Sequence, residues 1–303
     1  MASETSLSNA VGYFGPHTVT WQLYREPISV LGGVRALLLQ IAPPAVADGV
    51  ARYSNFQKDP FGRGYRTFAA MAMIYFGDKK QAEATAQRLW RIHSAIRGHY
   101  PIPNHQSPIP YSANDPDLLF WVLATLTDTT LQVYDRMPFL NLPPDWKEKF
   151  YEESKIAARL LGIPEEVYPP DVEAFQKYFS EILDGDLLGS APVCREMAQA
   201  IVQHPRAPKR LANLLAAGWL PAPLCQRLGI EGGEKPEIRL EKWLRRFGRV
   251  YRFVPSWLRY NPAYHQAQYR ISKATGKSPT LAGRFFNWLG RRGRVPLGLE
   301  TLK

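Results

Sequence analysis

The sequence predicts an all-α fold, arranged as a single large helical domain of about ten helices. Through most of the chain, apolar residues recur at the three- and four-residue steps of an amphipathic helix. No stretch shows the sustained apolar–polar alternation of a half-buried strand, and no Asn-Gly or Asp-Gly pair joins two such stretches. With 303 residues, the chain is long enough to bury a substantial core.

The first half of the chain yields helices separated by proline and glycine. We expect helices over residues 27–42, 45–56, 66–77, 78–98 and 117–137. The stretch 99–114 carries four prolines and is expected to be a loop. Asp115 and Pro116 then supply an N-cap and a first helical residue.

The second half continues in the same pattern. Further helices are expected over residues 148–162, 171–183, 192–204, 206–217, 237–253 and 263–274. The most linker-like piece is 230–238. We therefore divide the chain into an N-terminal segment (1–24), a helical catalytic domain (25–230) and a basic helical extension packed on that domain (231–303).

Net charge, cysteine count and the length of the apolar runs exclude several classes of protein. The formal net charge is +11, and the basic residues concentrate in the last sixty residues. This leaves contact with an anionic membrane surface open, whereas we do not expect nucleic acid, since a basic helical face is most often only solvated. Two distant cysteines, Cys194 and Cys225, exclude a cysteine-ligated iron–sulfur cluster and a disulfide-dense scaffold. Because the N-terminus lacks an apolar signal core and no apolar run reaches 18 residues, we expect a soluble, cytoplasmic protein.

One histidine stands on an apolar helical stripe. Ala82, Ala86, Leu89, His93 and Ile96 follow one another at steps of four and three residues, so they share a face. His93 is then either a core histidine bonded to a carbonyl or a metal or haem ligand, a neutral imidazole in a dry pocket.

Arginines surround this stripe. Arg91 lies close to His93, and Arg97, placed one helical turn after His93, could pair with an anionic group. Arg63, Arg66 and Thr67 open the apolar helix upstream. These arginines either reach solvent or form a polar patch over a reactive centre.

The helix that follows Asp115 has an inward face of its own, which comprises Leu118, Trp121, Val122, Thr125 and Thr129. This face is either ordinary core, with threonines bonded back to carbonyls, or one wall of a cofactor pocket formed by Trp121 and Thr125. Asp128 could pair with an arginine.

Four stretches carry a family resemblance: REPISVLGGVRALLLQIAPPAVADGVARYSNF (25–56), DPFGRGYRTFAAMAMIYFGD (59–78), RLWRIHSAIRGHY (88–100) and YSANDPDLLFWVLATLTDTTLQVYD (111–135). In order and spacing, they resemble the catalytic domain shared by the mpaB oxygenase and the rubber oxygenase (latex-clearing protein). Together they cover about residues 25–135.

The resemblance implies an all-α fold that binds haem b non-covalently, with His93 as the proximal iron ligand and Arg97 beside the haem. It places Arg63 and Thr67 on the distal side. It implies a reaction in which O₂ cleaves carbon–carbon double bonds of isoprenoid chains. The partners expected are therefore O₂ and a small lipophilic, unsaturated substrate.

The sequence departs from the family pattern in three places. Arg66 replaces a lysine that can ligate the iron in the rubber oxygenase, and a guanidinium is a poor iron ligand. Pro43 stands where many relatives have histidine, and no residue clearly matches the proposed catalytic glutamate, Asp48 being the nearest acid. Two alternatives stay open: a haem-binding carrier, sensor or peroxidase-like protein without oxygenase activity, and a non-enzymatic basic helical protein on a membrane surface or nucleic acid.

Overall fold

The computed structural model describes residues 4–54, 60–101, 107–137, 142–204, 209–232 and 234–292. These residues form α-helices, two short 3-10 helices and one two-stranded sheet. In chain order the elements are α1 (Glu4–Val11), α2 (Val19–Tyr24), η1 (Pro27–Gly32), α3 (Gly33–Gln40), α4 (Pro44–Tyr53), α5 (Pro60–Phe76), α6 (Lys79–Ser94), β1 (Arg97–Tyr100), β2 (Ile109–Ser112), α7 (Pro116–Arg136), α8 (Trp146–Leu160), η2 (Glu165–Val167), α9 (Val172–Asp184), α10 (Pro192–Val202), α11 (Lys209–Ala217), α12 (Ala222–Leu228), α13 (Glu234–Tyr251), α14 (Ser256–Arg259), α15 (Pro262–Ala274) and α16 (Leu281–Arg291).

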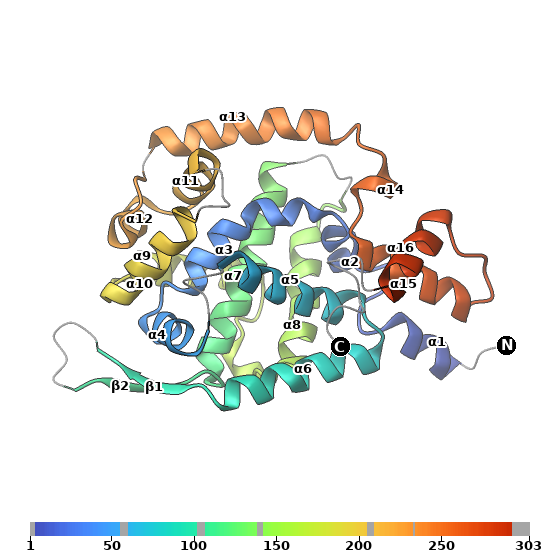
Figure 1. Cartoon of the computed structure of the whole chain (residues 1–303), viewed down its shortest axis with the longest axis horizontal. Helices are drawn as coiled ribbons and strands as arrows, with labels where there is room; N and C mark the ends of the chain where they lie inside the picture. Colours follow the sequence, from blue (N-terminus) through green and yellow to red (C-terminus); the bar gives the residue numbers. More distant parts are fainter. Residues whose placement is uncertain are drawn as a thin grey trace.

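The helices pack around a central group. Helices α7 and α8 run through the middle of the molecule, with α3 and α5 crossing them, while α6 and α13 lie along opposite edges (Figure 1). Most of α7 is buried, as expected for a helix surrounded by others. The prediction of an all-α class is therefore confirmed, with the small sheet as a minor addition.

Most expected helices are present, with ends shifted by a few residues. The N-cap of α7 is as predicted, because Asp115 accepts hydrogen bonds from the backbone of the first turn. The expected helix over 27–42 divides into η1 and α3 at Gly32–Gly33. Five short helices were not predicted, namely α1, α2, α12, α14 and α16, and the expected number of helices was therefore too low.

The proline-rich stretch 99–114 was wrongly expected to be a loop throughout. Strands β1 and β2 pair as an antiparallel hairpin, with Gly98 opposite Tyr111 and Tyr100 opposite Ile109. The hairpin extends away from the helices and packs against α4 at its base (Figure 1). Its strands are only four residues long, so apolar–polar alternation could not reveal them.

The preceding helix ends earlier than predicted. Gly98 was expected to stop it, but α6 ends at Ser94, and the chain turns at Ala95 into β1. At Gly98, a Cβ would lie 2.7 Å from the Tyr111 hydroxyl. The glycine therefore allows close approach of the tyrosine ring in the hairpin and does not cap the helix.

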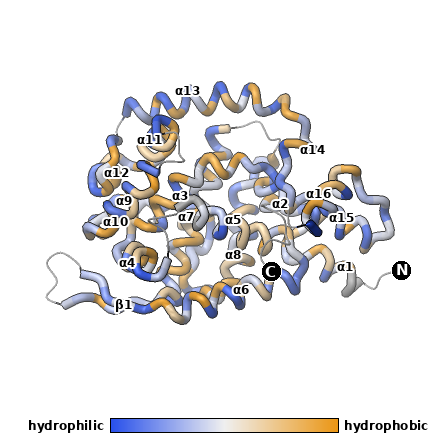
Figure 2. Tube along the Cα trace, viewed as in Figure 1, coloured by the Kyte–Doolittle hydropathy of each residue, from blue (hydrophilic) through white to orange (hydrophobic). Residues whose placement is uncertain are grey.

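The C-terminal helices pack on the rest of the chain. Helix α13 mixes hydrophilic and hydrophobic residues along its length (Figure 2) and buries Leu240 and Leu244. Glu26, fully buried, accepts a hydrogen bond from the Tyr251 hydroxyl at 2.9 Å and pairs with Arg259 at the same distance. Burial raises the pKa of Glu26, against the effect of these partners.

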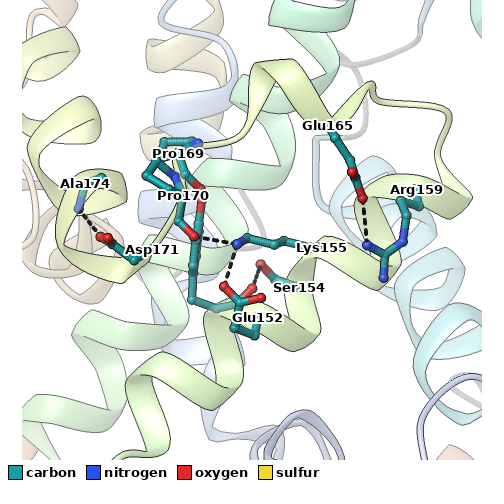
Figure 3. A network of polar contacts seen from close by, with 10 residues as sticks. Glu152, Ser154, Lys155, Arg159, Glu165, Pro169, Pro170, Asp171 and Ala174 are labelled. Atoms are coloured by element: carbon teal, nitrogen blue, oxygen red, sulfur yellow. Dashed lines mark hydrogen bonds and ion pairs between the residues drawn. The ribbon is translucent and has the colours of Figure 1, made fainter.

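Side-chain contacts also hold the connection between α8 and α9 (Figure 3). The Lys155 ammonium donates to the carbonyl of Pro170 at 2.6 Å, and Arg159 pairs with Glu165 at 3.2 Å. Asp171 then caps α9. The position of α9 matters for the site because its Phe179 stacks on Trp121.

Among the described residues, no single helix has the length and apolar character needed to cross a membrane. The segments Pro27–Gln40 and Pro44–Tyr53 meet the length and composition test only as a pair, which is bent by 101°.

Candidate functional site

A cavity of about 200 Å³ opens on the face of α6 that carries His93. We call it the His93 cavity. Its walls come from α3, α4, α5, α6, α7 and the hairpin. The described lining residues are mostly aliphatic, and His93 is their one histidine; none of them is a cysteine, carboxylate, lysine or arginine.

The helical stripe predicted from sequence faces this cavity. Ala82 and Ala86 are buried, and Ala86, Leu89, His93 and Ile96 line the cavity wall. The helix that presents them begins with a capping box, since Asp78 accepts from the backbone N–H of Gln81 and donates to its side chain in return. The prediction that the stripe faces inward is confirmed.

The arginines near His93 lie outside the cavity. Arg91 is exposed, with its guanidinium near the carbonyl of Gln87. Arg97 is exposed in β1, where its carbonyl accepts a hydrogen bond of 2.8 Å from the Tyr53 hydroxyl. The expectation that Arg97 follows His93 by one turn of the same helix is wrong, because α6 ends at Ser94.

Arg63, Arg66 and Thr67, the polar residues near the start of α5, do not all face the same way. Thr67 lines the His93 cavity, whereas Arg66 is exposed to solvent and lines neither cavity described below. The Arg63 side chain lies outside the described part of the structure. Of Arg66 and Thr67, whose side chains the structure describes, Thr67 is therefore the one that lies at the His93 cavity.

Trp121 and Thr125 lie in the core beside this cavity and do not line it. The Trp121 indole donates to the carbonyl of Leu39 at 2.9 Å and stacks on Phe179 with ring centroids 5.2 Å apart. The Thr125 hydroxyl donates back to the carbonyl of Val122 at 2.7 Å. This is the packing role that the sequence left open as an alternative.

A polar network that the sequence did not indicate borders the cavity. The Tyr111 hydroxyl donates to Asp48 at 2.7 Å, and Arg52 donates to the other oxygen of that carboxylate at 2.8 Å. Burial, followed by the contact with Asp48, raises the pKa of Tyr111. Asp48, the acid nearest to the expected catalytic base, is therefore engaged by two partners, and Tyr111 is the member of the network that lines the cavity.

A second cavity of about 360 Å³ adjoins the first, and we call it the Ser29 cavity. It lies between η1, α3, α5 and α7, and Asn261, just before α15, completes its wall. The two cavities share five lining residues: Leu37, Gln40, Thr67, Met71 and Leu126. Thr67 thus stands where the two cavities meet.

Comparison with known proteins identifies the family. The family described as "ER-bound oxygenase mpaB/B'/Rubber oxygenase, catalytic domain" matches residues 21–253, which is more than two thirds of the chain. The chain belongs to this family. As a member of an oxygenase family, it is an enzyme of the oxygenase class, and both His93 and Thr67 lie within the matched region.

Two mycobacterial proteins are similar to this oxygenase-family chain. They are the uncharacterized proteins Mb2261 of Mycobacterium bovis and Rv2237 of Mycobacterium tuberculosis. Each is 28% identical over 221 residues, which cover 69% of this chain and 82% of the relative. No solved structure gives a significant match.

Proposed function

We propose that the protein is a haem b-dependent oxygenase that uses O₂ on a lipophilic, unsaturated substrate. The observation that carries the proposal is His93, the one histidine among the described lining residues of a largely aliphatic cavity, in a chain of an oxygenase family. The resemblance of RLWRIHSAIRGHY (88–100) to the haem-ligand stretch of that family assigns the same residue.

The residues of the cavity suit a haem. A porphyrin supplies four nitrogen ligands itself, so one imidazole from the protein is enough to hold the iron. The aliphatic lining matches an apolar macrocycle. The His93 cavity is smaller than most ligand pockets, which span about 300–1,000 Å³, but it shares five lining residues with the adjoining Ser29 cavity of about 360 Å³.

In this proposal, each side chain at the site has a defined task. The His93 ring would hold the iron, and haem, when bound, would supply the binding and activation of O₂. The Thr67 hydroxyl, at the junction of the cavities, can donate a hydrogen bond to an oxygen atom that gains negative charge. Asp48, itself held by Arg52, accepts a hydrogen bond from the Tyr111 hydroxyl and so fixes the position of this side chain in the cavity wall.

The roles of Arg63, Arg66, Arg91 and Arg97 stay predictions. Three of these are exposed, so a role at the cofactor would require movement toward the cavity.

The first experiment is an absorption spectrum of the protein supplied with haem. We expect an intense Soret band in the wild type that is lost or shifted in His93→Ala. The matched control is His99→Ala, because His99 is exposed in β1 and lines neither cavity, so its spectrum should equal that of the wild type. A wild type without a Soret band, or an unchanged spectrum in His93→Ala, would refute the assignment.

Oxygen uptake then separates the remaining alternatives. The holoprotein should consume O₂ only when an unsaturated lipid is present. Haem binding without substrate-dependent uptake would instead support a carrier, sensor or peroxidase-like protein.

We also propose contact with an anionic membrane surface, through the end of α13 and α14. Phe253, Trp257 and Leu258 are exposed there, next to Arg249 and Arg252. An aromatic and aliphatic surface flanked by cations is typical of proteins that bind lipid headgroups. Binding to anionic vesicles should fall in a Phe253→Ser, Trp257→Ser variant, and equal binding by variant and wild type would refute the proposal.

A further inference from the structure

Gln40, the last residue of α3, lines both the His93 cavity and the Ser29 cavity. It is only 8% exposed, and its side-chain amide has no hydrogen bond to another residue in the part of the chain that the structure describes. Unlike the enclosed hydroxyl of Ser29, this amide keeps accessible surface, so a molecule in the cavity can reach it. Because burial of an amide without a partner costs free energy, its place in the wall points to a ligand that pairs with it.

Other polar side chains of the His93 cavity wall are already engaged by protein groups. Four of them donate hydrogen bonds to the protein, namely Tyr53, Ser54, Tyr111 and Asn114. Gln40 differs from these four, since both the nitrogen and the oxygen of its amide are available. An amide can donate as well as accept, and without a partner in the described protein either end can turn toward a ligand.

The backbone on both sides of Gln40 is held in place. The Trp121 indole donates to the carbonyl of Leu39 at 2.9 Å, and the backbone N–H of Gly189 donates to the carbonyl of Ala42 at 2.8 Å. A side chain that binds a ligand acts best from a backbone that is fixed by its neighbours. The Gln40 amide thus extends from a fixed point, although no described residue holds the amide itself.

Gln40 and His93 reach the His93 cavity from different walls. Helix α6, which carries His93, lies along one edge of the molecule, whereas α3 crosses its centre with α5 between the two helices (Figure 1). His93 lines the His93 cavity alone, while Gln40 and Thr67 also line the Ser29 cavity. A histidine fills one axial position of a haem iron, and a small ligand takes the other, on the side away from that histidine. A residue from another wall, such as Gln40, can face this second ligand.

We propose that the Gln40 amide donates a hydrogen bond to the small ligand, O₂ or carbon monoxide, that binds the haem iron opposite His93. The inference rests on the proposed binding of haem by His93. A neutral donor suits this task, because it stabilises negative charge on an oxygen atom without placing a buried cation in a largely aliphatic wall. Gln40 would act from α3 beside the Thr67 hydroxyl of α5.

The test uses carbon monoxide as a probe of the full chain loaded with reduced haem. A hydrogen-bond donor near the oxygen of carbon monoxide draws electron density from the iron into the bound ligand and lowers its C–O stretching frequency in the infrared spectrum. Gln40→Leu, which keeps a similar size but has no donor, should retain the Soret band and raise this frequency. O₂ should dissociate about 2- to 10-fold faster from this variant, as expected for the loss of one hydrogen bond.

Stability without haem separates a ligand-binding role from a structural one. Since the Gln40 amide has no partner among the described residues, Gln40→Leu should leave the urea midpoint of the haem-free protein unchanged or raise it. The matched control is Gln266→Leu, because Gln266 is 5% exposed, donates to the carbonyl of Phe286 and lines neither cavity. This control should lower the urea midpoint and keep the C–O frequency of the wild type.

Any of three results would overturn the proposal: a C–O frequency and an O₂ dissociation rate in Gln40→Leu equal to those of the wild type, a lower urea midpoint for haem-free Gln40→Leu, or the same frequency shift in Gln266→Leu. Equal frequencies would mean that the amide meets only water in the cavity. Failure of the proposed function has a different signature, since a wild type without a Soret band removes both proposals. A Soret band that depends on His93, together with equal frequencies, removes the role of Gln40 alone.

Discussion

Arg35 on α3 and Asp128 on α7 form an ion pair inside the helical core, with 4% and 6% of their side chains exposed and 2.5 Å between nitrogen and oxygen. Arg35 also donates to the Thr129 hydroxyl at 2.7 Å and lies near the carbonyl of Trp219. Burial lowers the pKa of Arg35, and the carboxylate of Asp128 acts in the opposite direction. The pair therefore joins the two helices whose residues Leu37 and Leu126 line both cavities.

Removal of one partner leaves the other charge buried without compensation. Each of Arg35→Met and Asp128→Leu should lower the free energy of unfolding by about 3–5 kcal/mol, a large part of the roughly 5–15 kcal/mol typical of a domain. The double variant leaves no unpaired charge, and its cost should be clearly below the sum of the two single costs, because replacing both partners of a buried pair by apolar residues is often close to neutral.

Urea denaturation of the four proteins measures this coupling. If a single variant is too unstable to purify, Asp128→Asn keeps an oxygen acceptor for Arg35 and should lie between the wild type and Asp128→Leu. Additive costs, or single-variant costs below about 1 kcal/mol, would refute the reasoning, since exposed pairs have values of that size.

Two further predictions concern the thiols and the glycines. Burial raises the pKa values of Cys194 and Cys225 to about 11, above the unfolded value near 8.5, so the folded chain keeps these protons and stability should fall as pH rises from about 9 to 11. A Cys194→Ala, Cys225→Ala variant should lose less stability over that range in pH-dependent urea melts; an equal loss would contradict the prediction. Gly98→Ala should destabilise the protein because its Cβ would lie within 3 Å of the Tyr111 ring, whereas Gly33→Ala, with open space, should be neutral or stabilising by about 0.5–1 kcal/mol. Thermal melts of this matched pair would refute the interpretation if Gly98→Ala melted no lower than Gly33→Ala.

Local sequence patterns predicted the helices of the site and the faces that they bury more reliably than the residues at which these helices end. The inward stripe of α6 and the N-cap of α7 follow from spacing of three and four residues and from Asp115, which are properties of one helix alone. The end of α6 depends on the pairing of β1 with β2, in which the outermost partners, Arg97 and Ser112, are far apart in the chain. For that reason the helix was extended too far, and Arg97 was placed on the wrong element.

Tertiary contacts account for the features that sequence analysis missed. Nothing near Asn261 in the chain distinguishes it from an ordinary Asn-Pro helix start, and it reaches the wall of the Ser29 cavity because α15 packs against α5 and α1. Likewise, Tyr111 reaches Asp48 only through the hairpin.

The residues that line the two cavities do not all lie within the region that matches the oxygenase family. His93 and Thr67 lie within the region that matches the oxygenase family, whereas Asn261 lies beyond residue 253, where the match ends. The proposed iron ligand and this wall residue of the Ser29 cavity therefore belong to separate parts of the sequence that meet through packing. It follows that Asn261→Ala should leave the Soret band of the holoprotein as it is, because Asn261 does not line the His93 cavity. Substitutions at His93, which lines the His93 cavity and lies within the matched region, should instead remove or shift that band.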